Sequence, residues 1–303
     1  MDRRDYLRVL GLGGAASLSG CVADGGGGSD GGSSSPSLAG GRLTLATATT
    51  AHDSGLLGAL NPGFGEAFGV EVRTLVEGTG AALRTARDGD CDVVLVHARS
   101  LEDRFLREGH GVNRRALMRN DFLLVGPPDD PADAAGADIT DAFRAVARAG
   151  APFLSRGDDS GTHVRERRIW DAAGVDPAGA WYRETGRSMG DTLTTASEAG
   201  AYTLTDRGTF LTLRPDLGLA AHVDRGIADP PPLLRNDYGV IPVNPARHEV
   251  AYPLAMAYVG YLTGPAQATI RGFRRDGERA FHPTALAPEP RFEQYVPTDW
   301  PGE

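Results

Sequence analysis

The chain has 303 residues and a formal net charge of −9, and every one of its 31 basic residues is arginine. No basic stripe is present, which excludes nucleic acid as an expected partner. The histidines are scattered without ligand spacing, so no metal ion held by protein side chains is predicted. A Walker A motif is also absent, and we expect no cofactor. Any bound anion must be held by local donors, because the net charge repels it.

The N-terminus has the order of a secretion signal. Arg3-Arg4 precedes a weakly apolar run from Val9 to Leu18, which is too short to span a bilayer. Twin arginines at this place are typical of a Tat signal. Leu18-Ser19-Gly20-Cys21 has the form of a lipobox. We therefore expect residues 1–21 to be a Tat-type lipoprotein signal with Cys21 lipidated, and a second chain or signal to be needed for stable anchoring.

A tether and a larger globular part follow the signal. Residues 22–41 are almost entirely Gly, Ser, Asp and Ala, a composition that cannot bury a core and behaves as a flexible linker. The chain from residue 42 onward is long enough for two lobes. Its single thiol, Cys91, starts an apolar strand, so a buried structural cysteine is expected.

Hydrophobic periodicity places strands and helices in alternation. Strands are predicted at 43–46, 70–76, 91–96, 121–125, 152–155, 201–205 and 238–243. Helices are predicted at 53–68, 80–87, 100–108, 138–149, 162–173, 190–199, from 207, and at 251–262 and 265–273. Pro62 should kink or divide the first helix. Ser100 and Asp103 should cap the third as a capping box.

This alternation predicts an α/β fold with parallel, doubly wound sheets. We expect two such lobes, lobe one from 42–123 and 239–285 and lobe two from 124–238, with a tail at 286–303. The strands at 122–125 and 239–243 would cross between the lobes. The ligand cleft would then lie between them.

Four segments place hydroxyls and glycines where a strand leads into a helix, at 47–50, 77–80, 155–163 and 202–209. A helix N-terminus has free N–H groups and a partial positive charge, and glycine lets a ligand approach the backbone. Such junctions gather at the carboxyl ends of strands, where ligands of open α/β sheets bind. The sequence therefore predicts a binding site for a small oxyanion that needs no lysine.

The third segment, from Ser155 to His163, carries the strongest signal. Arg156 can give two parallel N–H bonds to two oxyanion oxygens. Asp158 and Asp159 are expected to orient Arg156 or to cap the following helix. The predicted oxyanion donors are Thr49, Thr50, Thr79, Ser155, Arg156, Ser160, Gly161 and Thr162, with Tyr202 and Thr205 as further candidate contacts.

These segments resemble the TupA-type tungstate-binding proteins of ABC importers. The resemblance is carried by Leu45 to Thr50 with Asp53 to Leu57, Gly78-Thr79-Gly80, Asp92 to Ala98, Gly111 to Arg115, Asn120 to Phe122, Ser155 to His163, Ala201 to Thr209 and Tyr238 to Ile241. The family pattern Thr-Thr-Thr-Ser reads Thr47-Ala48-Thr49-Thr50 here, so one hydroxyl is missing at Ala48.

The resemblance implies a type II periplasmic-binding-protein fold whose lobes close on the ligand. It implies tungstate, or else molybdate, as that ligand, and an ABC permease with its ATPase subunit as partners. The protein would be extracytoplasmic, held at the cell membrane by its lipid anchor after Tat export, and monomeric.

Alternative functions make different demands on the sequence. A molybdate, sulfate or phosphate receptor of the same fold would use the same donors. A hydrolase would use Ser160 and His163 with Asp158 or Asp159, but no Gly-x-Ser-x-Gly elbow surrounds the serine. A structural lipoprotein would not need convergent hydroxyl loops. The sequence therefore favours a receptor over an enzyme.

Overall fold

The computed structural model describes residues 40–286, which belong to one compact unit of the chain. The predicted signal with Cys21, the tether up to residue 39 and the tail from residue 287 lie outside the described residues. Within residues 40–286, no helix has both the length and the apolar character needed to cross a bilayer.

The strands of residues 40–286 are β1 Arg42–Ala48, β2 Glu71–Glu77, β3 Val93–Val96, β4 Arg115–Gly126, β5 Phe153–Ser155, β6 Tyr182–Glu184, β7 Thr203–Asp206, β8 Ala220–Val223, β9 Arg235–Pro242, β10 Arg274–Arg275, β11 Glu278–Arg279 and β12 His282–Pro283. Each of the seven predicted strands overlaps a strand of the structure, whereas β6, β8, β10, β11 and β12 were not predicted.

The helices alternate with these strands along the chain. They are α1 Thr49–Asp53, α2 Leu56–Phe68, α3 Thr79–Asp88, α4 Arg99–Arg107, α5 Ile139–Ala149, α6 Gly161–Ala173, α7 Met189–Ala199, α8 Arg207–Leu213, α9 Tyr252–Thr263 and α10 Ala266–Gly272, with a 3₁₀ turn η2 at Arg214–Asp216.

The main sheet is mixed, which corrects the expectation of parallel sheets. Its path is β12-β4-β9-β3-β1-β2, and along this path only the neighbouring pairs β1–β2 and β1–β3 are parallel. Strand β9 pairs antiparallel with β3, and β4 pairs antiparallel with β9. The early β-α-β units give parallel pairs as predicted, whereas β9 returns from a distant part of the chain and inserts in the opposite direction.

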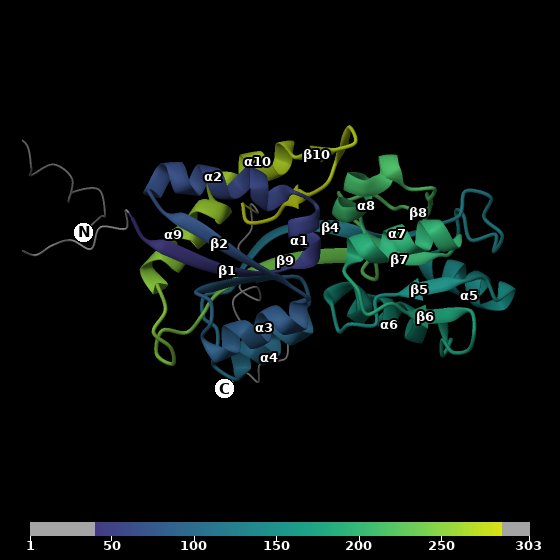
Figure 1. Cartoon of the computed structure of the whole chain (residues 1–303), viewed down its shortest axis with the longest axis horizontal. Helices are drawn as coiled ribbons and strands as arrows, with labels where there is room; N and C mark the ends of the chain where they lie inside the picture. The colour runs from purple at the N-terminus through teal and green to yellow at the C-terminus, as the bar shows by residue number, and fades with distance from the viewer. Residues whose placement is uncertain (1–39, 287–303) are drawn as a thin grey trace, which may run out of the picture. The chain divides into compact units, whose positions relative to one another are not determined.

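Strand β4 is long enough to serve two sets of neighbours. Its residues Arg115 to Asp121 pair with β9, and its residues Phe122 to Gly126 pair with β7 and β8. Figure 1 shows β4 and β9 running between two groups of helices. The strands predicted to cross between lobes, at 122–125 and 239–243, overlap β4 and β9.

The buried apolar side chains form separate cores on either side of these strands. One group packs α2, α3, α9 and α10 against β1–β3, with Phe64 and Tyr258 edge to face. The other packs α5, α6, α7 and α8 around β5 and β7, with Phe143, Phe153 and Trp170 in mutual contact. We call the elements around the first group lobe one and those around the second lobe two.

Two helix boundaries differ from their predictions. The first helix breaks at Gly55, which takes a left-handed φ of 75°, and Pro62 lies inside α2 rather than at a break. Helix α4 begins at Arg99 after Ala98, with no side-chain cap, so Ser100 is not its N-cap. The Ser100 hydroxyl instead accepts a hydrogen bond from Arg168 of lobe two at 3.1 Å.

Candidate functional site

The loop between β5 and α6 is fixed by its own polar side chains. Ser160 is the N-cap of α6 and accepts from the backbone N–H of His163 at 3.2 Å. Asp158 accepts from the backbone N–H of Ser160 at 3.2 Å. Gly157 and Asp159 both adopt left-handed φ values, of 62° and 54°. These turns hold the start of α6, with its free N–H groups, toward lobe one.

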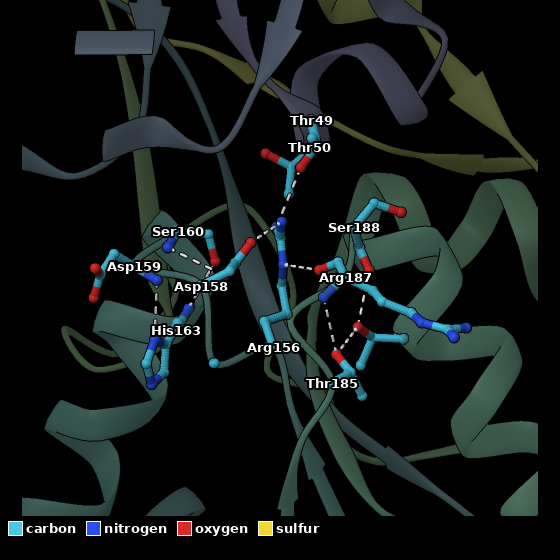
Figure 2. Close-up of polar contacts among 12 residues, drawn as sticks. Thr49, Thr50, Arg156, Asp158, Asp159, Ser160, His163, Thr185, Arg187 and Ser188 are labelled. Carbon is cyan, nitrogen blue, oxygen red and sulfur yellow. Dashed lines mark hydrogen bonds and ion pairs between the residues drawn. The ribbon is translucent and has the colours of Figure 1, made fainter. Parts of the chain in front are cut away.

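Arg156 crosses from this loop to the other lobe and is only 2% exposed. Its Nη1 donates to Thr49 Oγ1 at 3.1 Å and its Nη2 to Asp158 Oδ2 at 2.5 Å, while Nε donates to the carbonyl of Arg187 at 3.2 Å (Figure 2). Asp158 therefore both orients the guanidinium and braces the loop. Because each terminal nitrogen carries two hydrogens, both keep an N–H for another acceptor.

Lobe one faces the loop with the starts of α1 and α3. Helix α3 begins at Thr79 after Gly78, without a side-chain cap. A Cβ at Gly78 would lie 3.8 Å from Asp158 Oδ2, and one at Gly80 would lie 3.6 Å from the carbonyl oxygen of Asp159. The segment at 78–80 is thus packed directly against the Arg156 loop. The sequence predicts that both segments belong to one site.

Two of the predicted threonines have unused hydroxyls. Thr79 Oγ1 and Thr162 Oγ1 are buried, and neither has a hydrogen-bond partner among residues 40–286. A buried hydroxyl without a partner is costly, and native proteins rarely leave one. Thr79 starts α3 of lobe one and Thr162 lies in the first turn of α6 of lobe two. Each lobe therefore contributes one buried hydroxyl whose proton is not used within residues 40–286.

Thr50 differs from Thr49 because its hydroxyl already has two partners. It bonds to His97 Nε2 at 3.0 Å and accepts from the Tyr238 hydroxyl at 3.2 Å. A contact from Thr50 to a ligand would thus come from its backbone N–H. Sequence reasoning missed His97 and Tyr238 as supports of the site, although both stand in the segments that carry the family resemblance.

The segment after β6 also takes part without having been predicted. The carbonyl of Arg187 accepts from Arg156, and the backbone N–H of Gly186 donates to the Arg156 carbonyl at 2.8 Å. Ser188 then caps α7 through the backbone N–H of Asp191. No periodic pattern marks this loop. The one sequence signal in it is the Ser-x-x-Asp pattern at Ser188, which is typical of a helix N-terminus.

Three predicted contacts have other roles in the structure. Ser155 is buried and its hydroxyl accepts from the backbone N–H of Gly157 at 3.2 Å. Tyr202 directs its hydroxyl to Asp130 at 2.6 Å, and Thr205 donates to the carbonyl of Asp206 at 3.2 Å. The hydroxyls of Tyr202 and Thr205 are therefore used by Asp130 and by the backbone of Asp206 rather than at the Arg156 loop.

The hydrolase arrangement is not formed. Ser160 Oγ contacts the backbone N–H of His163, whereas the imidazole Nδ1 accepts from the backbone N–H of Asp159 at 3.2 Å. Within residues 40–286, no hydrogen bond joins the serine hydroxyl to the imidazole. A nucleophilic serine needs that contact with its base, so these side chains serve the loop rather than a triad.

Comparison with known proteins places this geometry in a family. The family described as PBP superfamily domain matches residues 30–266. A tungstate-binding protein TupA from Peptoclostridium acidaminophilum is 44% identical over 69% of this chain and 72% of its own length. The chain belongs to the TupA-type family of the PBP superfamily.

Two further relatives extend the TupA-type comparison. A Haloferax volcanii protein, provisionally named as an anion-binding protein of an ABC transporter, is 51% identical over the whole of this chain and 92% of its own length. The crystal structure of the tungstate ABC transporter from Geobacter sulfurreducens superposes with a TM-score of 0.68 at 46% identity, covering 74% of this chain and 94% of that one. The type II periplasmic-binding-protein fold, expected from sequence, is thus confirmed.

Proposed function

We propose that this chain is the substrate-binding protein of an ABC importer and captures tungstate between its two lobes. The observation that carries the proposal is Arg156, which is buried between the lobes and keeps N–H donors on both terminal nitrogens. The named ligands of its TupA-type relatives support tungstate over other oxyanions.

The binding mechanism is capture by fixed donors. Removing a dianion from water is costly unless its oxygens find hydrogen bonds. The spare N–H groups of Arg156 and the unused hydroxyls of Thr79 and Thr162 supply such bonds from both lobes. The N-termini of α3 and α6 add partial positive charge and backbone donors, among them Gly161. No net positive charge is required.

Closure follows from donors on both lobes. A ligand that bonds to both lobes stabilises the closed arrangement by its differential affinity for that state. We propose boundaries for the two lobes at 123/124 and 238/239, within or beside β4 and β9. The lobes would move about these two strands, and the closed form would dock on the permease.

The N-terminal residues suggest where the protein is located. We propose that residues 1–21 direct Tat export, that Cys21 carries the lipid anchor, and that residues 22–41 hold the folded part away from the membrane as a monomer. Import then requires an ABC permease with its ATPase subunit, because the chain itself has no Walker A motif.

Calorimetric titration of the purified protein with tungstate, molybdate, sulfate and phosphate tests the proposal. We expect tungstate to bind at submicromolar concentration, with sulfate and phosphate far weaker. Protonated phosphate should be disfavoured because a site built of donors leaves its O–H without an acceptor. Submicromolar phosphate binding with none for tungstate would replace the proposed ligand.

A further inference from the structure

A buried chain of hydrogen bonds runs from the proposed site into lobe two. Thr50 Oγ1 contacts His97 Nε2 at 3.0 Å, and His97 Nδ1 contacts Asn236 Oδ1 at 2.8 Å. Asn236 Nδ2 then donates to Asn120 Oδ1 at 2.7 Å, and Asn120 Nδ2 donates to Asp206 Oδ1 at 3.1 Å. The two asparagines face each other across β4 and β9.

The Asp206 end of the chain sets the direction of these bonds. Asp206 accepts from the backbone N–H of Thr209 at 3.1 Å and from its hydroxyl at 2.7 Å. Burial raises the pKa of Asp206 to about 6, so the group is a carboxylate at neutral pH and only accepts. Asn120 must therefore turn its Nδ2 toward Asp206, which leaves its Oδ1 to accept from Asn236.

The same logic fixes the tautomer of His97. Because Asn236 donates to Asn120 with its Nδ2, it presents Oδ1 to His97 and requires a hydrogen on Nδ1. Burial lowers the pKa of His97 to about 4, so the ring is neutral and its Nε2 is an acceptor. Arg156 and Arg165 also disfavour its protonation, while Asp158 favours it. Thr50 must then donate its hydroxyl proton to Nε2.

His97 contacts both walls of the proposed site. A Cβ at Gly161, the first residue of α6, would lie 2.4 Å from the imidazole Cε1, so the ring packs on the bare backbone of that helix start. The imidazole also stacks on Tyr238, with 4.9 Å between the ring centroids, and the Tyr238 hydroxyl donates to Thr50. The ring thus lies between Thr50 of lobe one and Gly161 of lobe two.

We propose that His97 is a positioning residue of the oxyanion site, which holds the first turn of α1 in place by accepting the hydroxyl proton of Thr50 at Nε2. The inference rests on the proposed function. In this role His97 acts through Thr50 rather than on the ligand itself. It orients Thr50 and, through the adjacent residue, Thr49, which receives Arg156. A histidine that only filled space would need neither a hydrogen on Nδ1 nor an acceptor at Nε2.

Three substitutions at one position separate these roles. His97→Gln keeps an acceptor near the place of Nε2, His97→Asn keeps a donor near the place of Nδ1, and His97→Phe keeps only a ring. We expect tungstate binding about 10-fold weaker in His97→Phe and His97→Asn, from the loss of one buried hydrogen bond, and within about 3-fold of wild type in His97→Gln. Equal losses in all three variants would overturn the proposal.

A double-mutant cycle tests whether His97 acts through Thr50. Thr50→Val alone should weaken binding about as much as His97→Phe, and the double variant should bind no more weakly than either single one. Fully additive losses would show that the two side chains act separately. Circular dichroism and thermal unfolding identify any variant that fails to fold. If the His97 variants do not fold, the binding affinity of Thr50→Val and the NMR spectrum of the wild-type protein test the proposal instead.

The tautomer itself has a spectroscopic signature. Long-range ¹⁵N–¹H correlation spectra of the histidine-labelled wild-type protein at pH 7 should show a protonated Nδ1 and an unprotonated Nε2 for His97, with His97→Gln assigning the signals. A protonated Nε2 would contradict the proposal. This readout needs no ligand, so it remains decisive even if titrations show that wild type binds no oxyanion and the proposed function fails.

Discussion

Arg156 of the loop after β5 donates a hydrogen bond of 3.1 Å to the hydroxyl of Thr49, the first residue of α1. This contact joins two segments that lie 107 residues apart in the sequence. It places the buried cation of lobe two against a helix start of lobe one. The proposed receptor function depends on this relationship, because it gives a dianion a partner on each side.

Arg156→Ala should weaken tungstate binding by at least about 100-fold. A charge-assisted bond contributes about 1.5–3 kcal/mol, and a bidentate contact would lose two of them. Arg156→Lys should recover only part of the loss, since an ammonium group cannot give two parallel bonds. Isothermal titration measures both, with Arg225→Ala as control because Arg225 donates to the carbonyls of Gly136 and Ala137. Unchanged affinity in Arg156→Ala would place the site elsewhere.

Thr79→Val and Thr162→Val should separate ligand binding from stability. Each removes a buried hydroxyl without a partner among residues 40–286, so the ligand-free protein should keep its stability or gain up to about 1 kcal/mol. Each should nevertheless weaken tungstate binding about 10-fold. Chemical denaturation and titration measure the two effects.

Thr203→Val is the matched control for that pair. Its hydroxyl is not among the proposed donors, because it donates to the carbonyl of Leu154 at 2.7 Å. We expect this variant to lose about 1 kcal/mol of stability while tungstate affinity stays unchanged. Thr79→Val with normal affinity would remove that hydroxyl from the set of donors.

Glu166 should make the wild-type protein less stable as pH rises. Burial raises the pKa of Glu166 to about 7 from 4.5, although Tyr182 and Trp170 donate to it. Between these values the folded state binds more protons than the unfolded state, so this group's contribution to stability falls as pH rises from 4.5 to 7 and is constant above.

Glu166→Gln removes that titration and isolates its effect. The variant should match wild type near pH 4 and exceed it by up to about 3 kcal/mol at pH 8, as the pKa difference predicts. Urea denaturation of both proteins at several pH values measures the difference. A difference independent of pH would mean that Glu166 is ionised normally in the folded state.

Asp121→Ala should destabilise the protein strongly. Asp121 is fully buried on β4 and accepts from Arg207 Nε and Nη2 at 2.6 and 2.9 Å. Breaking a buried pair costs about 3–5 kcal/mol when the remaining charge has no other partner. Because Arg207 keeps its ion pairs with Asp224 and Glu278, we expect a smaller loss of about 2–3 kcal/mol. Asp276→Ala is the control, since its ion pair with Arg214 is more exposed and worth about 1 kcal/mol or less. Similar losses in both variants would contradict this reading.

Local patterns predicted most of the elements and the Arg156 loop. Asp138 is the N-cap and Gly150 the C-cap of α5, as their residue types indicate. The caps of α6 are Ser160 and Gly174. These predictions succeeded because the responsible interactions join residues a few positions apart. The position of Pro62 was misjudged because packing of α2 overrides the propensity of one residue.

Other features depend on contacts that no local pattern encodes. The antiparallel insertion of β9 arises from the return of the chain between lobes, and strand alternation alone does not distinguish it from a parallel strand. Tyr202 stands in a hydroxyl-rich segment, yet its side chain turns to Asp130. His97 could not be linked to Thr50 or Asn236 from sequence, because its partners lie 47 and 139 residues away.

A crystal structure of the protein grown with tungstate, with an anomalous difference map at the tungsten absorption edge, tests the central claim most directly. We expect one strong peak between the lobes, with tungstate oxygens within about 3.2 Å of Arg156, Thr79 Oγ1 and Thr162 Oγ1. A tungsten peak elsewhere on the molecule, with these three groups still lacking a ligand, would contradict it.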